Sequence, residues 1–347
     1  MSDRAPRTAA AERVGDGVYR LPLPVPFDED GVNAYALLGE QPALVDVGPR
    51  TEQAWQALCA QLDALGLAPH QLAHVIITHA HVDHHGNLGR LVREAPAVRV
   101  HCHRDDAAAI FEFTEEVDRR AALLEPVLVH WGMEPSRRAA TLAAYRGFAR
   151  MAESVDRLHL EPLAGERAEV VFGQRRLVAI HTPGHSPGQI VLHLQEGQGA
   201  LFSADHILER ITPNPAVYAP PYRGRRTGLV DYLASLQALR PLAAAWVLPG
   251  HGPPFQGLVH RIEGILLHHE RRAQQILALL QERAASVAEL VPRLWGDLDA
   301  VAFFMACREV HGHLDLLVER GACRLELGPD GTARYQARSN SPRRIMR

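Results

Sequence analysis

Four side chains that can bind a metal ion stand within six residues of one another, namely His79, His81, Asp83 and His84. Imidazole nitrogens and carboxylate oxygens are both suitable ligands for zinc. Because an α-helix would point these four side chains in different directions around its axis, we expect an irregular loop to bring them together. In an extended segment the alternate residues His79 and His81 can reach one ion, whereas Asp83 and His84 can turn toward a second.

Three further potential ligands stand in separate motifs later in the chain. His185 lies in Thr-Pro-Gly-His-Ser-Pro-Gly, Asp205 follows a short apolar run, and His251 lies in Pro-Gly-His-Gly. The residues beside them, glycine and proline above all, let the backbone turn sharply. Four separate motifs of this kind favour a built metal site over a set of solvated loop residues.

With these motifs in this order, the chain resembles the metallo-β-lactamase-like superfamily, in the branch of glyoxalase-II-like hydrolases and lactamase-like proteins with a C-terminal winged helix. The resemblance covers residues from about 14 to about 337. It implies two metal ions held by seven side chains: His79, His81 and His185 at the first, Asp83, His84 and His251 at the second, and Asp205 bridging both. The family often has glycine just before the bridging aspartate, where this chain has Ala204 and therefore an extra methyl group.

The chemistry implied by such a site is metal-dependent hydrolysis. Two cations about 3.5–4 Å apart can share a bridging water and lower its pKa from about 15.7 toward 7, which gives a metal-bound hydroxide nucleophile. We expect Asp83 to orient this nucleophile or to shuttle a proton, in addition to binding a metal. Zinc is the first expectation for both ions, although the same donors suit iron or manganese.

The motif set favours cleavage of a small ester, thioester or lactone. The alternative within the same chemistry is a phosphodiesterase or endoribonuclease acting on single-stranded RNA, which some winged-helix relatives perform. A non-enzymatic alternative is a metal-stabilised module that recognises DNA through a winged helix. β-Lactam hydrolysis is disfavoured because the first 13 residues contain no apolar run of signal-peptide length.

Composition limits the partners that the chain can attract. The net charge is -3 and all 37 basic residues are arginine, so nothing draws the whole molecule toward nucleic acid or an anionic membrane. We therefore expect a small-molecule substrate and regard nucleic acid as a less favoured partner. The family resemblance also leaves a homodimer open.

The cysteines and the apolar runs indicate the compartment. Four cysteines stand far apart without paired spacing, which argues against a disulfide framework. The apolar runs all stay below the roughly 18 residues that a membrane span needs. We expect a soluble, cytoplasmic protein.

The elements that must position these ligands alternate between strands and helices. Apolar runs at residues 75–77, 200–203 and 245–248 each end at a motif, so the ligands are expected where strands stop. Apolar residues spaced by three and four over residues 51–65 predict an amphipathic helix. With the resemblance, this rhythm predicts an α/β fold, an αββα sandwich of the metallo-β-lactamase type.

The chain is expected to divide into a tail and two domains. Residues 1–13 read as a disordered tail and residues 14–257 as the hydrolase domain. Within that domain, residues from about 107 to 152 read as a helical insert that is broken at Pro126, Gly132 and Pro135 and either selects substrate or only packs. Three helices and a hairpin after residue 258, with Ser286 as a helix N-cap, predict a small winged-helix-like domain over residues 258–347.

The segment after Asp205 is expected to overhang the metal site. Residues 211–226 are rich in proline and arginine, and Tyr218, Tyr222 and Arg223 in it could contact an anionic group of the substrate. A proline-stiffened surface loop with solvated arginines is an equally good interpretation.

Overall fold

The structure is a computed structural model of the 347-residue chain and describes residues 10–26, 28–217 and 228–338. The chain forms two compact units, each built from segments that are separated in the sequence. The first unit runs to Glu116 and also contains residues 148–213 and 241–258, and the second contains residues 117–147, 214–240 and those from 259 onward.

The first sheet of unit 1 has seven strands that follow one another in chain order. Their bounds are β1 Glu12–Gly15, β2 Val18–Val25, β3 Asp28–Leu37, β4 Ala43–Val45, β5 His74–Ile76, β6 Arg99–His103 and β7 Leu160–Leu163. Strands β1 to β4 pair antiparallel, and β4 to β7 pair parallel. Strand β1 begins at Glu12, so Glu12 and Arg13, which were expected in the tail over residues 1–13, belong to this sheet instead.

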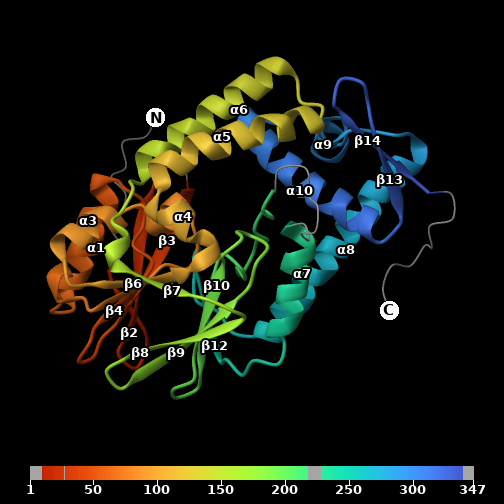
Figure 1. Cartoon of the computed structure of the whole chain (residues 1–347). Coiled ribbons are helices and arrows are strands. Elements are labelled where there is room, and N and C mark those ends of the chain that lie inside the picture. Colours follow the sequence, from red (N-terminus) through yellow and green to blue (C-terminus); the bar gives the residue numbers. More distant parts are fainter. Residues whose placement is uncertain (1–9, 27, 218–227, 339–347) are drawn as a thin grey trace. The chain divides into compact units, whose positions relative to one another are not determined.

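The second sheet of unit 1 faces the first. Its strands lie in the order β12, β11, β10, β9, β8, with bounds β8 Arg167–Phe172, β9 Arg175–His181, β10 Ile190–Leu194, β11 Ala200–Ala204 and β12 Trp246–Pro249 (Figure 1). Apolar side chains of both sheets form one buried cluster, in which Tyr35 of β3 meets Phe202 of β11 edge-on with ring centroids 5.2 Å apart. The two sheets therefore share a core.

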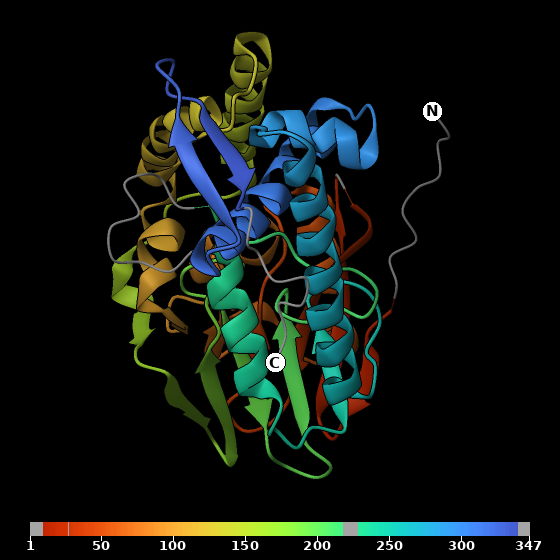
Figure 2. The ribbon, with the colours of Figure 1, turned by 90° about the vertical axis from the view of Figure 1, so that its right-hand side faces the viewer.

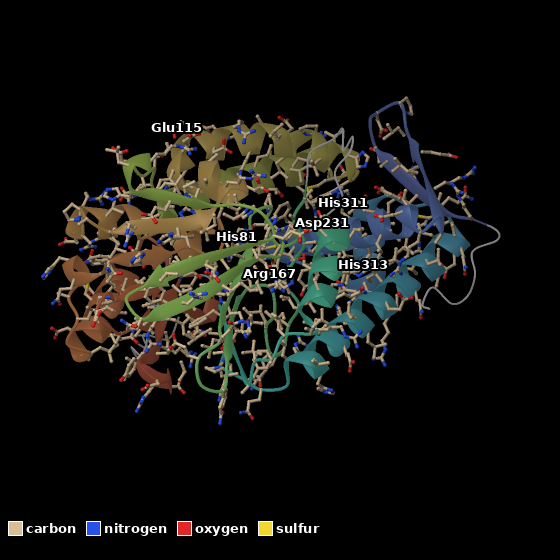
Figure 3. All side chains as sticks on the ribbon, turned by 60° about the horizontal axis from the view of Figure 1, so that its bottom comes forward. His81, Glu115, Arg167, Asp231, His311 and His313 are labelled. Atoms are coloured by element: carbon tan, nitrogen blue, oxygen red, sulfur yellow. The ribbon has the colours of Figure 1, made fainter. Side chains whose placement is uncertain are left out.

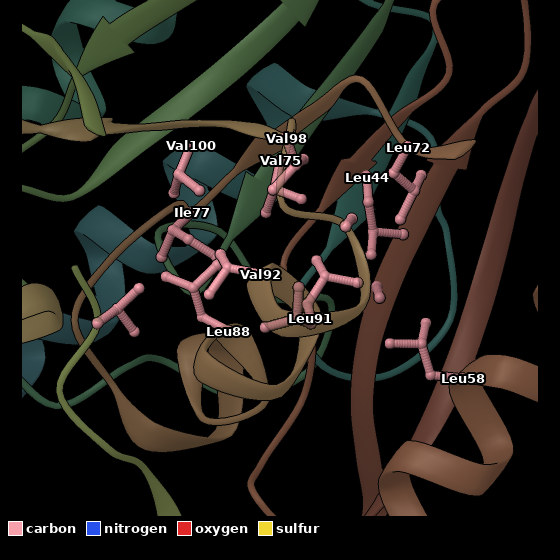
Figure 4. Packing of buried hydrophobic residues seen from close by; sticks show 14 of the residues in the cluster. Leu44, Leu58, Leu72, Val75, Ile77, Leu88, Leu91, Val92, Val98 and Val100 are labelled. Atoms are coloured by element: carbon pink, nitrogen blue, oxygen red, sulfur yellow. The ribbon is translucent and has the colours of Figure 1, made fainter. Parts of the chain in front are cut away.

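Helices cover the other face of the first sheet. They are α1 Glu52–Ala64, α2 Val82–His85, α3 Leu88–Glu94 and α4 Arg104–Phe111. Figure 4 shows part of this second core, where Leu58 of α1 and Leu91 of α3 lie among residues of the sheet such as Val75. Burial of each such side chain stabilises the fold by about 1.5–3 kcal/mol. The predicted α/β class is confirmed, and so is the helix over residues 51–65, which Thr51 caps.

Unit 2 consists mainly of helices and a hairpin (Figure 2). Its elements are the larger parts of α5 Phe113–His130 and α8 Leu258–Glu282, together with α6 Pro135–Gly147, α7 Gly228–Leu239, α9 Val287–Trp295, α10 Ala300–Glu319, β13 Cys323–Leu327 and β14 Ala333–Ala337. The predicted three helices, the hairpin and the Ser286 N-cap are confirmed, while the winged-helix assignment stays a prediction. Among the described residues, every helix is too short or too polar to cross a membrane.

Pro126 does not break the predicted helical insert, because α5 continues through it. Proline removes one backbone hydrogen bond from a helix and strains the preceding turn. The residues that follow it, Val127, Leu128 and Trp131, are all buried in the apolar core of unit 2. Their burial outweighs the local cost, and the prediction of a break at this position is wrong. The breaks predicted at Gly132 and Pro135 are confirmed, because α5 ends at His130 and α6 begins at Pro135.

The pKa of Asp315 on α10 is raised to about 7, first by burial and then by Glu319. His311, labelled on the same helix in Figure 3, lies 3.4 Å from the carboxylate, but burial lowers the pKa of that ring to about 4, so it is neutral at pH 7. Between about pH 4 and pH 7 the folded state thus binds more protons at this carboxyl than the unfolded state. Stability from this group is therefore lost as the pH rises through that window.

We expect Asp315→Asn to stabilise the protein at pH 8 by up to about 4 kcal/mol, the equivalent of three pKa units, and to leave it nearly unchanged at pH 4. Denaturant unfolding followed by circular dichroism at both pH values measures this difference. The exposed Asp297 provides the matched control Asp297→Asn. An Asp315→Asn variant whose gain is the same at both pH values would contradict the burial argument.

Candidate metal centre

The seven expected ligands meet where strands of unit 1 end. They come from the ends of four strands: His79, His81, Asp83 and His84 from the segment after β5, which includes α2, His185 from the turn after β9, Asp205 directly after β11, and His251 two residues after β12. They form two groups, and within each group the potential ligand atoms all lie within 4.8 Å of one another. The first group consists of His79, His81, His185 and Asp205, and the second of Asp83, His84 and His251. His81 is labelled in Figure 3.

In the first group, three imidazole nitrogens and one carboxylate oxygen converge. His81 Nδ1 lies 3.0 Å from His79 Nε2 and 2.8 Å from His185 Nε2. The latter nitrogen is also 3.4 Å from Asp205 Oδ2. Ligands held about 2.0–2.1 Å from one tetrahedral zinc ion would lie about 3.3 Å apart. The spacing thus suits a single small cation.

In the second group, the other oxygen of Asp205 provides the link. Asp205 Oδ1 lies 3.2 Å from His84 Nε2 and 3.6 Å from His251 Nε2. His251 Nε2 is also 3.3 Å from Asp83 Oδ2. The two oxygens of Asp205 therefore face different groups, which is the arrangement that a residue shared by two cations requires.

Buried polar atoms at the centre fit a cation. His84 donates its Nδ1 proton to Asp46 over 2.8 Å, so the neutral ring, once Nε2 has given up its proton, presents its lone pair on Nε2. His84 Nε2 and Asp205 Oδ1 are both buried and, although 3.2 Å apart, form no hydrogen bond of acceptable geometry. Buried polar atoms in native proteins normally have a partner. A bound cation would satisfy both atoms.

Asp46, which the sequence analysis did not single out, also fixes His79. The carboxylate accepts hydrogen bonds from the backbone N–H and the hydroxyl of Thr78, over 2.9 and 2.8 Å. Because the Thr78 hydroxyl proton is committed to Asp46, His79 must donate its Nδ1 proton to Thr78 Oγ1 over 3.1 Å. That leaves the lone pair of His79 on Nε2, toward the first group. The signal in the sequence was one charged residue inside an apolar run.

His251 is held in the same way by β3. Its Nδ1 lies 2.7 Å from the carbonyl oxygen of Gly31. Asn33 donates to the carbonyls of Pro249 and Gly252 over 2.9 and 2.8 Å, and the hydroxyl of Tyr35 donates to Pro249 over 2.7 Å. Burial raises the pKa of Tyr35, so this hydroxyl remains a donor. These contacts fix the turn that carries His251.

The expectation that a loop carries the whole first motif is wrong in part. His79 and His81 do lie outside regular structure, but Asp83 and His84 belong to the single helical turn α2, for which His81 is the N-cap. Neighbouring residues in a helix point about 100° apart. One turn is too short to scatter four ligands, and it leaves Asp83 and His84 within the same group.

The charges of the two groups are interdependent. Burial lowers the pKa of His79 well below its usual value, and His84 and His81 lower it further. Burial would also lower the pKa of His84, but Asp205, Asp46 and Asp83 outweigh it and raise that pKa to about 10. Burial raises the pKa of Asp83, but His84 and His251 together lower it by more. The pKa of Asp83 is therefore about 2. The pKa of Asp205 is lowered as well, so Asp83 and Asp205 stay ionised and can neutralise added positive charge.

Ala204 explains why the family often has glycine before the shared aspartate. Its φ is 45°, in the left-handed region that non-glycine residues rarely adopt. Such a conformation costs about 1–3 kcal/mol and is held here by a 2.8 Å hydrogen bond from the Gly250 N–H to the Ala204 carbonyl.

The three predicted substrate contacts, Tyr218, Tyr222 and Arg223, lie outside the described residues.

The fold is that of a known superfamily of metal-dependent hydrolases. Residues 27–251 match the model of the metallo-beta-lactamase superfamily, and the chain belongs to that superfamily. It is 26% identical over 304 residues to the probable metallo-hydrolase YqjP of Bacillus subtilis, covering 87% of this chain and 92% of that protein. A crystal structure of a metallo-beta-lactamase family protein from Thermus thermophilus superposes with a TM-score of 0.79 and 28% identity, covering 94% of this chain and 100% of the other.

A third relative has a more specific description. The chain is 25% identical over 288 residues to an atrochrysone carboxyl ACP thioesterase of Aspergillus fumigatus, covering 78% of this chain and 70% of that protein. The superfamily and the His and Asp groups together identify this chain as a hydrolase that binds divalent metal ions.

Proposed function

We propose that the chain is a dinuclear metallohydrolase that cleaves a small ester, thioester or lactone. The observation that supports two cations is the position of Asp205, whose two carboxylate oxygens face the first and the second group separately. Divalent cations bound there, with zinc as the first choice, would acidify a water and polarise the oxygen of a carbonyl substrate.

The residues of the chain would divide the work as their positions suggest. The ligand set is His79, His81 and His185 for the first cation, Asp83, His84 and His251 for the second, and Asp205 for both. Asp83 would in addition accept a hydrogen bond from the attacking water at a carboxylate oxygen and take up its proton. Asp46, Gly31 and Thr78 hold His84, His251 and His79 with the required nitrogen facing inward.

Two observations favour an acyl substrate over RNA. The relative from Aspergillus fumigatus is named as a thioesterase acting on an acyl carrier protein, and the chemistry of a thioester suits a polarised carbonyl. The net charge of -3 provides no overall attraction to a polyanion. A thioester is therefore the first substrate class to test.

A substrate panel with metal control tests the proposal. The protein is stripped with a chelator, reloaded with zinc, manganese or iron, and assayed on acyl-coenzyme A thioesters, glutathione thioesters, lactones, aryl esters and single-stranded RNA. We expect turnover on one of the acyl classes that is lost on stripping and restored by metal. Cleavage of RNA with the acyl substrates untouched would support an endoribonuclease, and turnover that ignores metal would overturn the metallohydrolase assignment.

A further inference from the structure

Asp106 lies on α4, outside the ligand motifs, and its side chain is completely buried. Its carboxylate accepts three hydrogen bonds. Oδ2 accepts from the backbone N–H of Ala80 over 2.9 Å and from the hydroxyl of Ser186 over 2.6 Å, and Oδ1 accepts from the backbone N–H of Gly188 over 2.8 Å. A buried carboxylate is tolerated only when donors surround it, and here they do.

The three donors belong to the two segments that carry the first ligand group. Ala80 is the residue between His79 and His81, and Ser186 follows His185 directly. Asp106 thus binds both segments through one carboxylate, although Ala80 and Ser186 are more than 100 positions apart in the chain. The 2.8 Å separation between the ring nitrogens of His81 and His185 depends on how these two segments are aligned.

Gly188 shows how closely the second segment approaches α4. A Cβ atom on Gly188 would lie 2.6 Å from the backbone nitrogen of Asp106 and 2.7 Å from its Cβ. Both neighbours are fixed by the start of the helix, so a side chain at position 188 would have to separate the two segments. This explains the second glycine of the Thr-Pro-Gly-His-Ser-Pro-Gly motif.

The second ligand group has a different support. Asp46 holds His84, and the backbone of Gly31 holds His251. Partners of this outer kind keep metal ligands in place, and their loss typically weakens metal binding about 10–100-fold. Asp106 touches no ligand ring in any of its three hydrogen bonds and acts through the backbone on either side of the ligands.

We propose that Asp106 is a positioning residue that aligns the His79–His81 segment with the His185 segment and thereby sets the affinity of the first metal position. The proposal rests on the two-cation centre proposed above. It predicts a selective defect: loss of this carboxylate weakens one of the two cations, while the position formed by Asp83, His84 and His251 keeps its supports.

Asp106→Asn is the sharpest test. The amide has nearly the same shape, but its NH2 group must face at least one of the three donors, which breaks that hydrogen bond. We expect zinc affinity at one position to fall about 10–100-fold, so that equilibrium dialysis against a moderate chelator leaves one zinc per chain where the native protein keeps two. Asp105→Asn is the matched control, because Asp105 is the adjacent residue, has an exposed carboxylate and forms ion pairs only with His103 and Arg104 among the described residues.

Two further variants approach the same contacts from the other segment. Ser186→Ala removes one hydrogen bond and should weaken zinc less than Asp106→Asn does, while Gly188→Ala should weaken it at least as much because it forces the segments apart. The thermal unfolding midpoint of each metal-free variant is recorded by circular dichroism. The proposal is overturned if Asp106→Asn binds two zinc ions at native affinity. It is also overturned if the variant loses both ions and its metal-free unfolding midpoint falls by a large amount. Native protein that binds fewer than two ions would instead overturn the two-cation centre.

Discussion

Replacing Asp205 by asparagine will deprive the protein of at least one of the two proposed metal ions and reduce metal-dependent turnover by more than about 100-fold. This residue faces both ligand groups, with Oδ2 3.4 Å from His185 Nε2 and Oδ1 3.2 Å from His84 Nε2. An amide has one acceptor oxygen and one NH2 group, so it can serve one group at most. Loss of an outer partner typically costs about 10–100-fold in metal affinity or activity, and a ligand shared by two cations should exceed that range.

The measurement is metal content by atomic emission after gel filtration, together with turnover on the substrate found in the panel. Asp63→Asn, at an exposed position on α1, is the matched control and should keep native metal content and activity. If the Asp205→Asn variant retained two ions per chain, metal binding would not depend on the two carboxylate oxygens of native Asp205 facing different groups.

Alanine at Gly250 should disable the second ligand group as severely, although position 250 itself provides no ligand. The new Cβ would overlap Asp205 Oδ1 and lie 2.8 Å from His84 Cε1. The backbone cannot move away easily, because the Gly250 N–H donates to Ala204 over 2.8 Å and its carbonyl accepts from the Asn33 N–H over 2.7 Å. Overpacking of this kind typically costs about 1–3 kcal/mol, and here it is directed at two ligands.

We therefore expect Gly250→Ala to fold with a lowered thermal midpoint, to hold at most one metal ion and to lose about 99% of turnover or more, the upper end of the loss that follows from displaced ligand supports. Gly39→Ala is the control for glycine replacement in the same unit, because a Cβ there would have open space around it. Native metal content in Gly250→Ala would mean that Asp205 and His84 can shift without losing their ions. The assignment of a tightly built centre would then be wrong.

The sequence by itself identified the seven candidate ligands, the α/β class and the superfamily. This was possible because the ligands stand in short motifs, each directly after an apolar run that forms a strand, as at Asp205 after β11. Local signals of this kind depend on the side chains within one segment. The helix over residues 51–65 and the N-cap at Ser286 were predicted for the same reason.

Only the tertiary structure decided what aligns those ligands. The hydrogen bonds through which Asp46, Asn33 and Asp106 hold the ligand segments join residues 26 to 219 positions apart in the chain. No spacing pattern indicates which distant group a lone carboxylate or amide will meet. The continuation of α5 through Pro126 is a similar case, since burial of Trp131 in the core of unit 2 overrode a local preference. A hydrogen bond or a buried contact depends on which segments the fold brings together, and motif spacing does not contain that information.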